Sequence, residues 1–283
     1  MERTSCLLFQ CRDQVGIIAA LVDFFKDNNV SISRFEEYTD ASNFFTRLEW
    51  REQNPWSDVE TFAERFQHVA AQFKQSRFRV HFFDQPQRLG LFSSKEPHAL
   101  IEALNKCEAG DYPNTEVVFL IANSRKIEKY ALRYDIPFYF VKTYKDPLRH
   151  EEEQLKIIAE HKPDLIGLAR YMKILTKEFI AGTGCPIVNI HHSFLPSFVG
   201  AKPYELAYER GVKLIGATSH YVIPALDQGP IIEQDVIRLR PGDSVEHMKR
   251  IGRDVEKKVF ATALEKALHH KTITYDNKTI VFQ

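Results

Sequence analysis

From residue 88 onward, the chain alternates short apolar runs with amphipathic stretches. Apolar side chains recur three and four residues apart in those stretches, a spacing typical of helices. The expected strands cover residues 88–92, 116–122, 137–141, 164–169 and 186–191, and the expected helices cover 98–107, 125–134, 149–161 and 176–181. This alternation predicts a doubly wound, mostly parallel sheet flanked by helices, in an α/β domain that spans residues 88–283.

The first part of the chain has a different order. Expected strands at 6–11, 30–38, 43–50 and 77–83 are interrupted by two expected helices, at 13–29 and 57–74. Asp13 is a suitable N-cap for the first helix, and its apolar stripe is Val15, Ile18, Leu21, Val22 and Phe25. The order β-α-β-β-α-β predicts a ferredoxin-like α+β unit over residues 1–84.

Within this unit the residues Asp13, Gly16, Asn29, Val30 and Ile32 fit a short pattern, D-x-x-G followed by an apolar helix and an N-V-x-I strand. In these positions the sequence resembles the ACT domain family over residues 4–83. The resemblance implies self-association into a homo-oligomer. It also implies either binding of an amino-acid effector or a purely scaffolding role.

Charge and cysteine content narrow the class of protein. Lys plus Arg number 38, equal to Asp plus Glu, and no long basic block occurs, so a nucleic-acid partner is not expected. No run approaches the roughly 20 apolar residues of a membrane span, and the N-terminus does not have the pattern of a secretory signal. The four cysteines form no Cys-x-x-Cys pair, so a cytoplasmic protein with a small-molecule partner is expected.

Polar side chains follow the apolar run at residues 187–190. Asn189 and His191 stand at its end, a turn-rich segment extends to Gly200, and Asp227 occurs further on in LDQGPII. An amide can stabilise an oxyanion, and a carboxylate can keep an imidazole protonated, so the three groups suit attack on an acyl carbonyl. No G-x-S-x-G nucleophile elbow is present, which favours direct attack by water or an amine.

Other common sites are not indicated. The first strand-to-helix turn of the second domain, SSKEPHAL at residues 93–100, lacks a G-x-G-x-x-G or Walker pattern, so no nucleotide cofactor is expected. The histidine spacing fits no standard zinc motif, so no metal is expected either. Residues 245–270 are expected to form a long packing helix with Arg253, Glu256 and Lys257 on its solvated face, followed by a hairpin at 275–282.

The segments NIHHSFLPSFVGAKPYELAYERGVKLIGATSHYV and LDQGPIIEQDV resemble the folate-dependent formyltransferase fold family. Within that family they are most similar to the deformylase branch, and the similarity runs from residue 88 to residue 283. The resemblance implies hydrolysis of 10-formyltetrahydrofolate to formate and tetrahydrofolate, which supplies formate for purine synthesis and balances one-carbon folate pools. It implies no cofactor, because the folate is the substrate.

Position by position, the resemblance assigns catalysis to Asn189, His191 and Asp227. It assigns folate binding to Met172, Lys173, Leu175, His220, Ile223, Pro224 and Ala225. Lys173 replaces the arginine usual in the family, and a lysine lacks the planar fork of a guanidinium. His220 is expected to support either Asp227 or the folate.

The acceptor of the formyl group is the remaining question. In this family, enzymes that formylate a phosphate-bearing amine hold the phosphate with a glycine-rich loop at the position of SSKEPHAL, and they usually carry proline at the position of His192. Both differences favour water as the acceptor. Formyl transfer to an amine stays open as an alternative, as does a non-catalytic sensor of folate and an amino acid.

Overall fold

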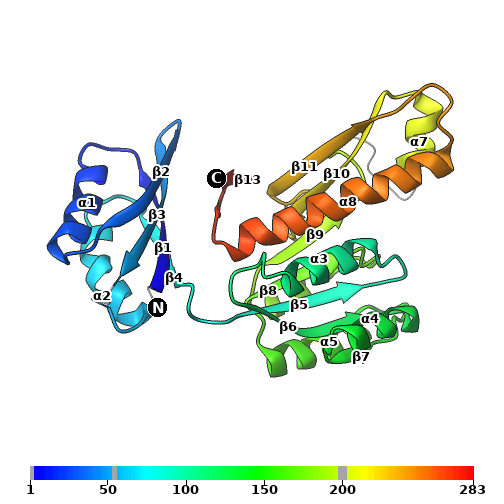
Figure 1. Ribbon diagram of the computed structural model, residues 1–283, viewed down its shortest axis with the longest axis horizontal. Helices are drawn as coiled ribbons and strands as arrows, with labels where there is room; N and C mark the ends of the chain where they lie inside the picture. Colours follow the sequence, from blue (N-terminus) through cyan, green and yellow to red (C-terminus); the bar gives the residue numbers. More distant parts are fainter. Residues whose placement is uncertain (1–2, 53–55, 197–202) are drawn as a thin grey trace. The chain divides into compact units, whose positions relative to one another are not determined.

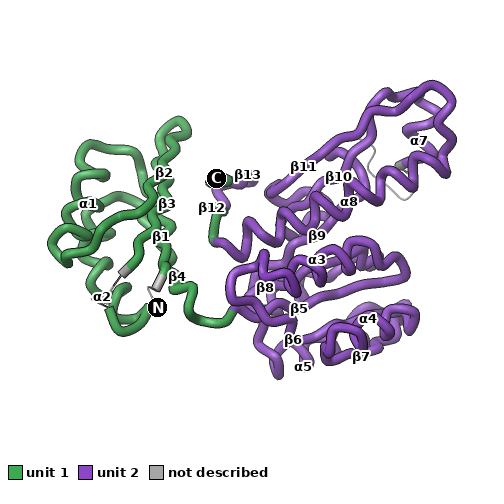
Figure 2. The backbone as a smooth tube through the Cα atoms, in the orientation of Figure 1, with its two compact units in different colours: residues 1–86, 270–273, 280–283 green, residues 87–269, 274–279 purple. Residues whose placement is uncertain are grey.

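The computed structural model describes residues 3–52, 56–196 and 203–283 (Figure 1). Part of the turn-rich segment after His191, up to Gly200, therefore lies outside the described residues. The chain divides into two compact units (Figure 2). One unit is Met1–Pro86 with His270–Ile273 and Ile280–Gln283, and the other is Gln87–His269 with Thr274–Thr279. The end of the chain, which the sequence places in the second domain, thus contributes residues to the first unit.

The first unit has the expected β-α-β-β-α-β order. It consists of β1 (Arg3–Arg12), α1 (Ile17–Asp27), β2 (Ile32–Asp40), β3 (Asn43–Glu52), α2 (Val59–Ala70) and β4 (Arg77–Phe82). The strands form an antiparallel sheet in the order β2-β3-β1-β4, as in ferredoxin-like folds. Aromatic side chains fill its core, where the Trp50 and Phe62 rings stack with centroids 5.3 Å apart.

Helix α1 begins later than the sequence predicts. Its N-cap is Gly16, with φ 95°, and the prediction that Asp13 caps it is wrong. Because glycine adopts this left-handed conformation without strain, the chain turns there and the helix starts at Ile17. The buried residues of α1 are Ile17, Leu21, Phe24 and Phe25. The side chains of Val15, Ile18 and Val22, which the sequence places on the same apolar stripe as Leu21 and Phe25, are exposed.

The second unit is the expected α/β domain. Its elements are β5 (Gln87–Ser93), α3 (His98–Glu108), β6 (Thr115–Ala122), η1 (Arg125–Ile127), α4 (Glu128–Arg133), β7 (Phe138–Phe140), α5 (Leu148–His161), β8 (Leu165–Ala169), α6 (Lys177–Gly182), β9 (Ile187–His191), α7 (Pro203–Arg210), β10 (Leu214–Tyr221), β11 (Ile231–Arg238) and α8 (Val245–Leu268). The terminal hairpin, β12 (Thr272–Tyr275) and β13 (Lys278–Val281), forms a separate two-stranded sheet.

The seven-stranded sheet has the order β11-β10-β9-β8-β5-β6-β7. Strands β9, β8, β5, β6 and β7 are parallel to one another, and β10 pairs antiparallel with both β9 and β11. The prediction of a mostly parallel sheet is therefore confirmed. The chain leaves β5 toward β6 and β7 and later returns to add β8 on the other side. Ligands of open α/β sheets bind at such a switch point, beyond the carboxyl ends of the strands.

Helix α8 packs along one face of this sheet (Figure 1). Val259, Phe260 and Leu264 are fully buried in the core cluster that it forms with β5 and α3. Gly167 in β8 permits this approach, because a Cβ there would lie 3.1 Å from Phe260. In the described ranges, no helix combines the length and the apolar character needed to cross a membrane.

Candidate functional site

A cavity of about 400 Å³ lies beyond the carboxyl ends of β8 and β9. Its walls are the loop that follows β8, the ends of β9 and β10, and the loop between β10 and β11. The predicted site residues that line it are Met172, Lys173, Leu175, Asn189, His191, His220, Ile223, Pro224 and Asp227. Ala225, predicted to contact folate, does not line the cavity.

Strand β9 delivers the amide and the imidazole together. Side chains two residues apart on a strand point to the same face, so Asn189 and His191 lie side by side. Strand β10 pairs with β9 in a register that sets His220 opposite Asn189. The Asn189 Nδ2 atom donates to the Nε2 atom of His220, at 3.3 Å.

Asp227 reaches this pair from the loop between β10 and β11. Its Oδ2 atom lies 3.2 Å from Nδ1 of His191, and its Oδ1 atom lies 3.6 Å from Nε2 of His220. The hydrogen bond from His191, together with the nearby His220, holds the pKa of Asp227 well below its usual range, against the opposing effect of burial. The carboxylate is therefore ionised at neutral pH and pairs with the imidazole of His191.

The backbone of this loop is specialised. Asp227 itself adopts φ 54°, in the left-handed region that residues other than glycine rarely occupy. At Gly229 a Cβ would lie 1.7 Å from the carbonyl oxygen of Tyr221, so only glycine lets the loop return to β10 here. Backbone strain of this kind commonly occurs at functional sites.

The two histidines are held in defined orientations. The His220 Nδ1 atom lies 2.9 Å from the carbonyl oxygen of Tyr221, and because a carbonyl only accepts, Nδ1 carries a proton. For His191, Nδ1 faces Asp227, while Nε2 is buried and has no hydrogen-bond partner among the described residues. Nε2 of His191 and the second N–H of Asn189 are thus available to a ligand.

The loop after β8 supplies an apolar mouth to the cavity. Met172 is 55% exposed and Ile174 is 68% exposed, and Leu226 across the cavity is 53% exposed. The backbone N–H of Met172 donates to Ser94 Oγ at 3.1 Å, which ties this loop to the end of β5. Lys173 is exposed, whereas Leu175 packs against a buried cluster. Exposed apolar side chains around a cavity fit a flat, largely apolar ligand.

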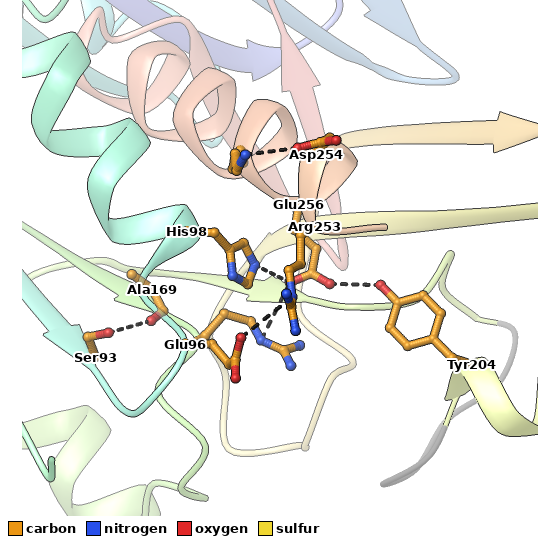
Figure 3. A network of polar contacts seen from close by, with 10 residues as sticks. Ser93, Glu96, His98, Ala169, Tyr204, Arg253, Asp254 and Glu256 are labelled. Atoms are coloured by element: carbon orange, nitrogen blue, oxygen red, sulfur yellow. Dashed lines mark hydrogen bonds and ion pairs between the residues drawn. The ribbon is translucent and has the colours of Figure 1, made fainter. Parts of the chain in front are cut away.

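A buried polar cluster next to the site was not predicted from the sequence. Glu256 on α8 accepts hydrogen bonds from His98 Nε2 at 2.7 Å and from the Tyr204 hydroxyl at 2.8 Å. Figure 3 shows these two residues on opposite sides of Glu256. The Nε atom of Arg170, a cavity-lining residue, lies 3.4 Å from the same carboxylate.

The prediction that Glu256 lies on a solvated face of α8 is wrong, since the residue is only 2% exposed. Burial raises the pKa of Glu256, but the hydrogen bond from His98 and the charge of Arg170 outweigh it and leave the pKa lowered. The periodicity of α8 contains a signal for this burial: Gly252 and Phe260 stand four residues before and after Glu256, and both are buried. Arg253 and Lys257 are partly exposed, and each pairs with a carboxylate, Glu96 and Asp254 respectively.

The turn between β5 and α3 contains no glycine. Its Ser93 hydroxyl donates to the carbonyl oxygen of Ala169 at 3.1 Å (Figure 3), and its Pro97, at the N-cap of α3, has no N–H to offer. The hydroxyls of Ser93 and Ser94 therefore hold β5 to the loop after β8 and form no open cradle for a phosphate. Among the described residues, no three His, Cys, Asp or Glu side chains are grouped in a way that could hold a metal ion.

Comparisons with known proteins agree with this geometry. Residues 87–264 match the family model described as formyl transferase. The chain is 39% identical to the formyltetrahydrofolate deformylase of Synechocystis sp., over 99% of this chain and 98% of that protein. A crystal structure of a formyltetrahydrofolate deformylase from Pseudomonas syringae pv. tomato superposes with a TM-score of 0.95 at 40% identity, covering 100% of this chain and 95% of that one.

A glycinamide ribonucleotide transformylase from Symbiobacterium toebii superposes with a TM-score of 0.66 at 25% identity. That comparison covers 98% of the transformylase but 72% of this chain. The deformylases thus match this chain over almost its full length, whereas the transformylase matches only part of it.

Proposed function

The chain belongs to the formyl transferase family and, within it, to the formyltetrahydrofolate deformylases, and from that premise we propose that Asn189, His191 and Asp227 carry its reaction. The enzyme is a hydrolase that converts 10-formyltetrahydrofolate to formate and tetrahydrofolate. One observation carries the assignment of roles: the ionised Asp227 lies within 3.2 Å of His191, in a cavity that Asn189 also lines.

Water attacks the formyl carbon, and the electron pair of the C=O bond moves to the oxygen. The amide N–H of Asn189 and the Nε2–H of protonated His191 stabilise this oxyanion, since both groups are free to face the substrate. Asp227 keeps His191 protonated and oriented through Nδ1. Collapse of the intermediate breaks the bond between the formyl carbon and N10, N10 gains a proton, and formate and tetrahydrofolate leave.

His220 acts in this scheme as a positioning residue. Its Nε2 atom accepts a hydrogen bond from Asn189, and its Nδ1 proton is held by the Tyr221 carbonyl. The contact fixes one N–H of Asn189 and directs the other toward the oxyanion. This role differs from the direct folate contact that the sequence predicts, and Met172, Lys173 and the segment from Ile223 to Pro224 remain for that contact.

Water is the acceptor because the site offers no place for a phosphate-bearing amine. The turn that precedes α3 has its serine hydroxyls bound internally and places Glu96 near the start of the helix, paired with Arg253 at 3.5 Å. A carboxylate near the N-terminus of α3 repels a phosphate. The relatives named as deformylases favour hydrolysis over transfer in the same way.

We further propose that the first unit is an ACT-like domain that mediates self-association and binds a small amino acid, in a cytoplasmic enzyme whose formate supplies purine synthesis. Its ferredoxin-like strand order and the exposed apolar side chains of Val15, Ile18 and Val22 support self-association. Light scattering of the purified protein tests the oligomer. A calorimetric titration with glycine and with methionine tests the effector, and no heat from either would remove both candidates.

The assignment of Asp227 is tested by Asp227→Asn. The amide keeps the shape of the side chain but cannot hold His191 protonated, so formate release is expected to fall by about 10²- to 10⁴-fold. Asp254→Asn is the matched control, because Asp254 is an exposed carboxylate paired with Lys257 on α8. Near-normal formate release by Asp227→Asn would show that the proposed roles are wrong.

A further inference from the structure

The mechanism above leaves one proton without a destination. The attacking water must lose a proton as its oxygen bonds to the formyl carbon. Both carboxylate oxygens of Asp227 are already engaged, Oδ2 with Nδ1 of His191 at 3.2 Å and Oδ1 beside Nε2 of His220 at 3.6 Å. Asn189 has no basic atom, and His191 acts in its protonated form. A further group beside the formyl carbon is therefore required.

His192 stands next to this site. It lines the cavity described above and also a second, mostly apolar cavity of about 360 Å³. Its ring centroid lies 5.3 Å from that of His191 and 6.2 Å from that of Tyr204. The residue is 9% exposed, and no hydrogen bond holds either ring nitrogen among the residues that the structure describes. His192 is thus a nearly buried imidazole with unused hydrogen-bonding capacity at the wall of the catalytic cavity.

The surroundings of His192 keep it neutral. Burial is the main cause, the positive charge of Arg170 adds to it, and together they lower the pKa of His192 to about 4. Glu256 and Asp227 act in the opposite direction, and His191 acts in the same direction as Arg170. At neutral pH the ring therefore has a free lone pair, while its neighbour His191 is paired with a carboxylate.

The buried cluster of Glu256, His98, Tyr204 and Arg170 explains how this arrangement is maintained. The Tyr204 hydroxyl is fixed to Glu256 (Figure 3). This hydrogen bond orients the Tyr204 ring, whose centroid lies 6.2 Å from that of His192. Gly252 makes room for that ring, because a Cβ there would lie 2.1 Å from the Tyr204 hydroxyl. The same carboxylate lies 3.4 Å from Nε of Arg170, and so keeps the guanidinium where its charge acts on His192.

We propose that His192 is the general base that takes the proton from the attacking water. This inference rests on the proposed hydrolysis. One O–H bond of water breaks, its proton moves to a ring nitrogen of His192, and the water oxygen bonds to the formyl carbon. When the intermediate collapses, His192 returns that proton to N10 as the C–N bond breaks, so the histidine is unchanged after each turnover.

The variants His192→Gln and His192→Ala test this role. Both remove the basic nitrogen, and kcat for formate release is expected to fall at least about 100-fold, while KM for 10-formyltetrahydrofolate stays within about twofold. Added imidazole is expected to restore activity at least about tenfold in His192→Ala, because the truncation opens space beside the second cavity. His247→Gln, at a partly exposed histidine on α8, is the matched control and keeps wild-type kcat.

Two controls make the outcomes separable. Calorimetric binding of tetrahydrofolate to each variant establishes that the folate site is folded. If the wild-type protein released no formate, the proposed function itself would fail. If the wild type were active and either variant kept kcat within about threefold, or if imidazole gave no rescue of a folded His192→Ala protein, the base role of His192 would be overturned.

Discussion

The Nδ1 atom of His191 lies 3.2 Å from the Oδ2 atom of Asp227, although the two residues come from different elements. His191 ends β9, and Asp227 stands in the loop between β10 and β11. The contact exists because that loop adopts a left-handed turn at Asp227 and closes back on β10 at Gly229. The backbone of this loop therefore sets the position of the Asp227 carboxylate beside His191.

Gly229→Ala is expected to lower formate release at least about tenfold. A Cβ at this position would lie 1.7 Å from the Tyr221 carbonyl oxygen, so the loop has to move and carries Asp227 away from His191. Gly211→Ala is the control for a general loss of stability, because Gly211 has φ 66° but a Cβ there meets no atom within 4 Å. Wild-type turnover by Gly229→Ala would show that the loop geometry is not required.

Asp227 is also expected to make stability depend on pH. Its pKa is lowered in the folded protein by the hydrogen bond from His191 and by the nearby His220, so its contribution is fully present above the unfolded pKa of about 4. The contribution is lost as the pH falls toward the lower, folded pKa. The difference in Tm between the wild type and Asp227→Asn should therefore be constant near neutral pH and shrink below about pH 4. A difference that grew on acidification would contradict this.

Asn189→Ala is expected to lower kcat by about 10²- to 10³-fold, as loss of one oxyanion donor does elsewhere, with little change in KM. One N–H of Asn189 is bound to His220, and the other faces the formyl oxygen. The hydrogen bond from this second N–H becomes stronger only when negative charge develops on that oxygen in the transition state. Steady-state kinetics of formate release measures both constants. A rise in KM at unchanged kcat would instead place Asn189 in ground-state folate binding.

Met172→Ala is expected to raise KM about tenfold with little change in kcat. Met172 is 55% exposed at the mouth of the cavity, and a folate ring that covers it would gain the apolar contact that the truncation removes. Leu132→Ala is the matched control, since Leu132 is an exposed apolar residue on α4 that does not line the cavity. Equal effects of the two substitutions would argue against folate contact at Met172.

His98→Phe is expected to lower the free energy of unfolding by about 3 kcal/mol, because Glu256 would lose a hydrogen-bond donor in a buried setting. The double variant His98→Phe/Glu256→Leu should recover most of that loss, since no buried carboxylate remains. Chemical denaturation measures both. Equal destabilisation in the single and double variants would mean that the cost comes from packing rather than from the buried charge.

The fold could be predicted from the sequence because its signals are local and repeated. The alternation of strands and helices after residue 88 yields the sheet, and a polar Asn189 and His191 at the end of a buried strand indicate the site. The start of α1 was harder to predict, since Gly16 sets it through a left-handed φ that no periodicity reveals.

The cluster around Glu256 could not be predicted for a different reason. Its members come from α3, the end of β8, α7 and α8, so only the tertiary fold brings His98, Arg170, Tyr204 and Glu256 together. In the sequence, Glu256 stands among other charged residues, a pattern typical of a solvent-exposed helix face. The burial of Glu256 becomes evident only when the surface that faces α8 is known.

The most direct test of hydrolysis is incubation of the wild-type protein with 10-formyltetrahydrofolate in ¹⁸O-labelled water, without any amine. Mass spectrometry of the formate and spectroscopy of the folate follow the two products. Hydrolysis predicts formate and tetrahydrofolate in equal amounts, with one labelled oxygen in each newly formed formate. Release of formyl groups only after an amine acceptor is added would contradict it.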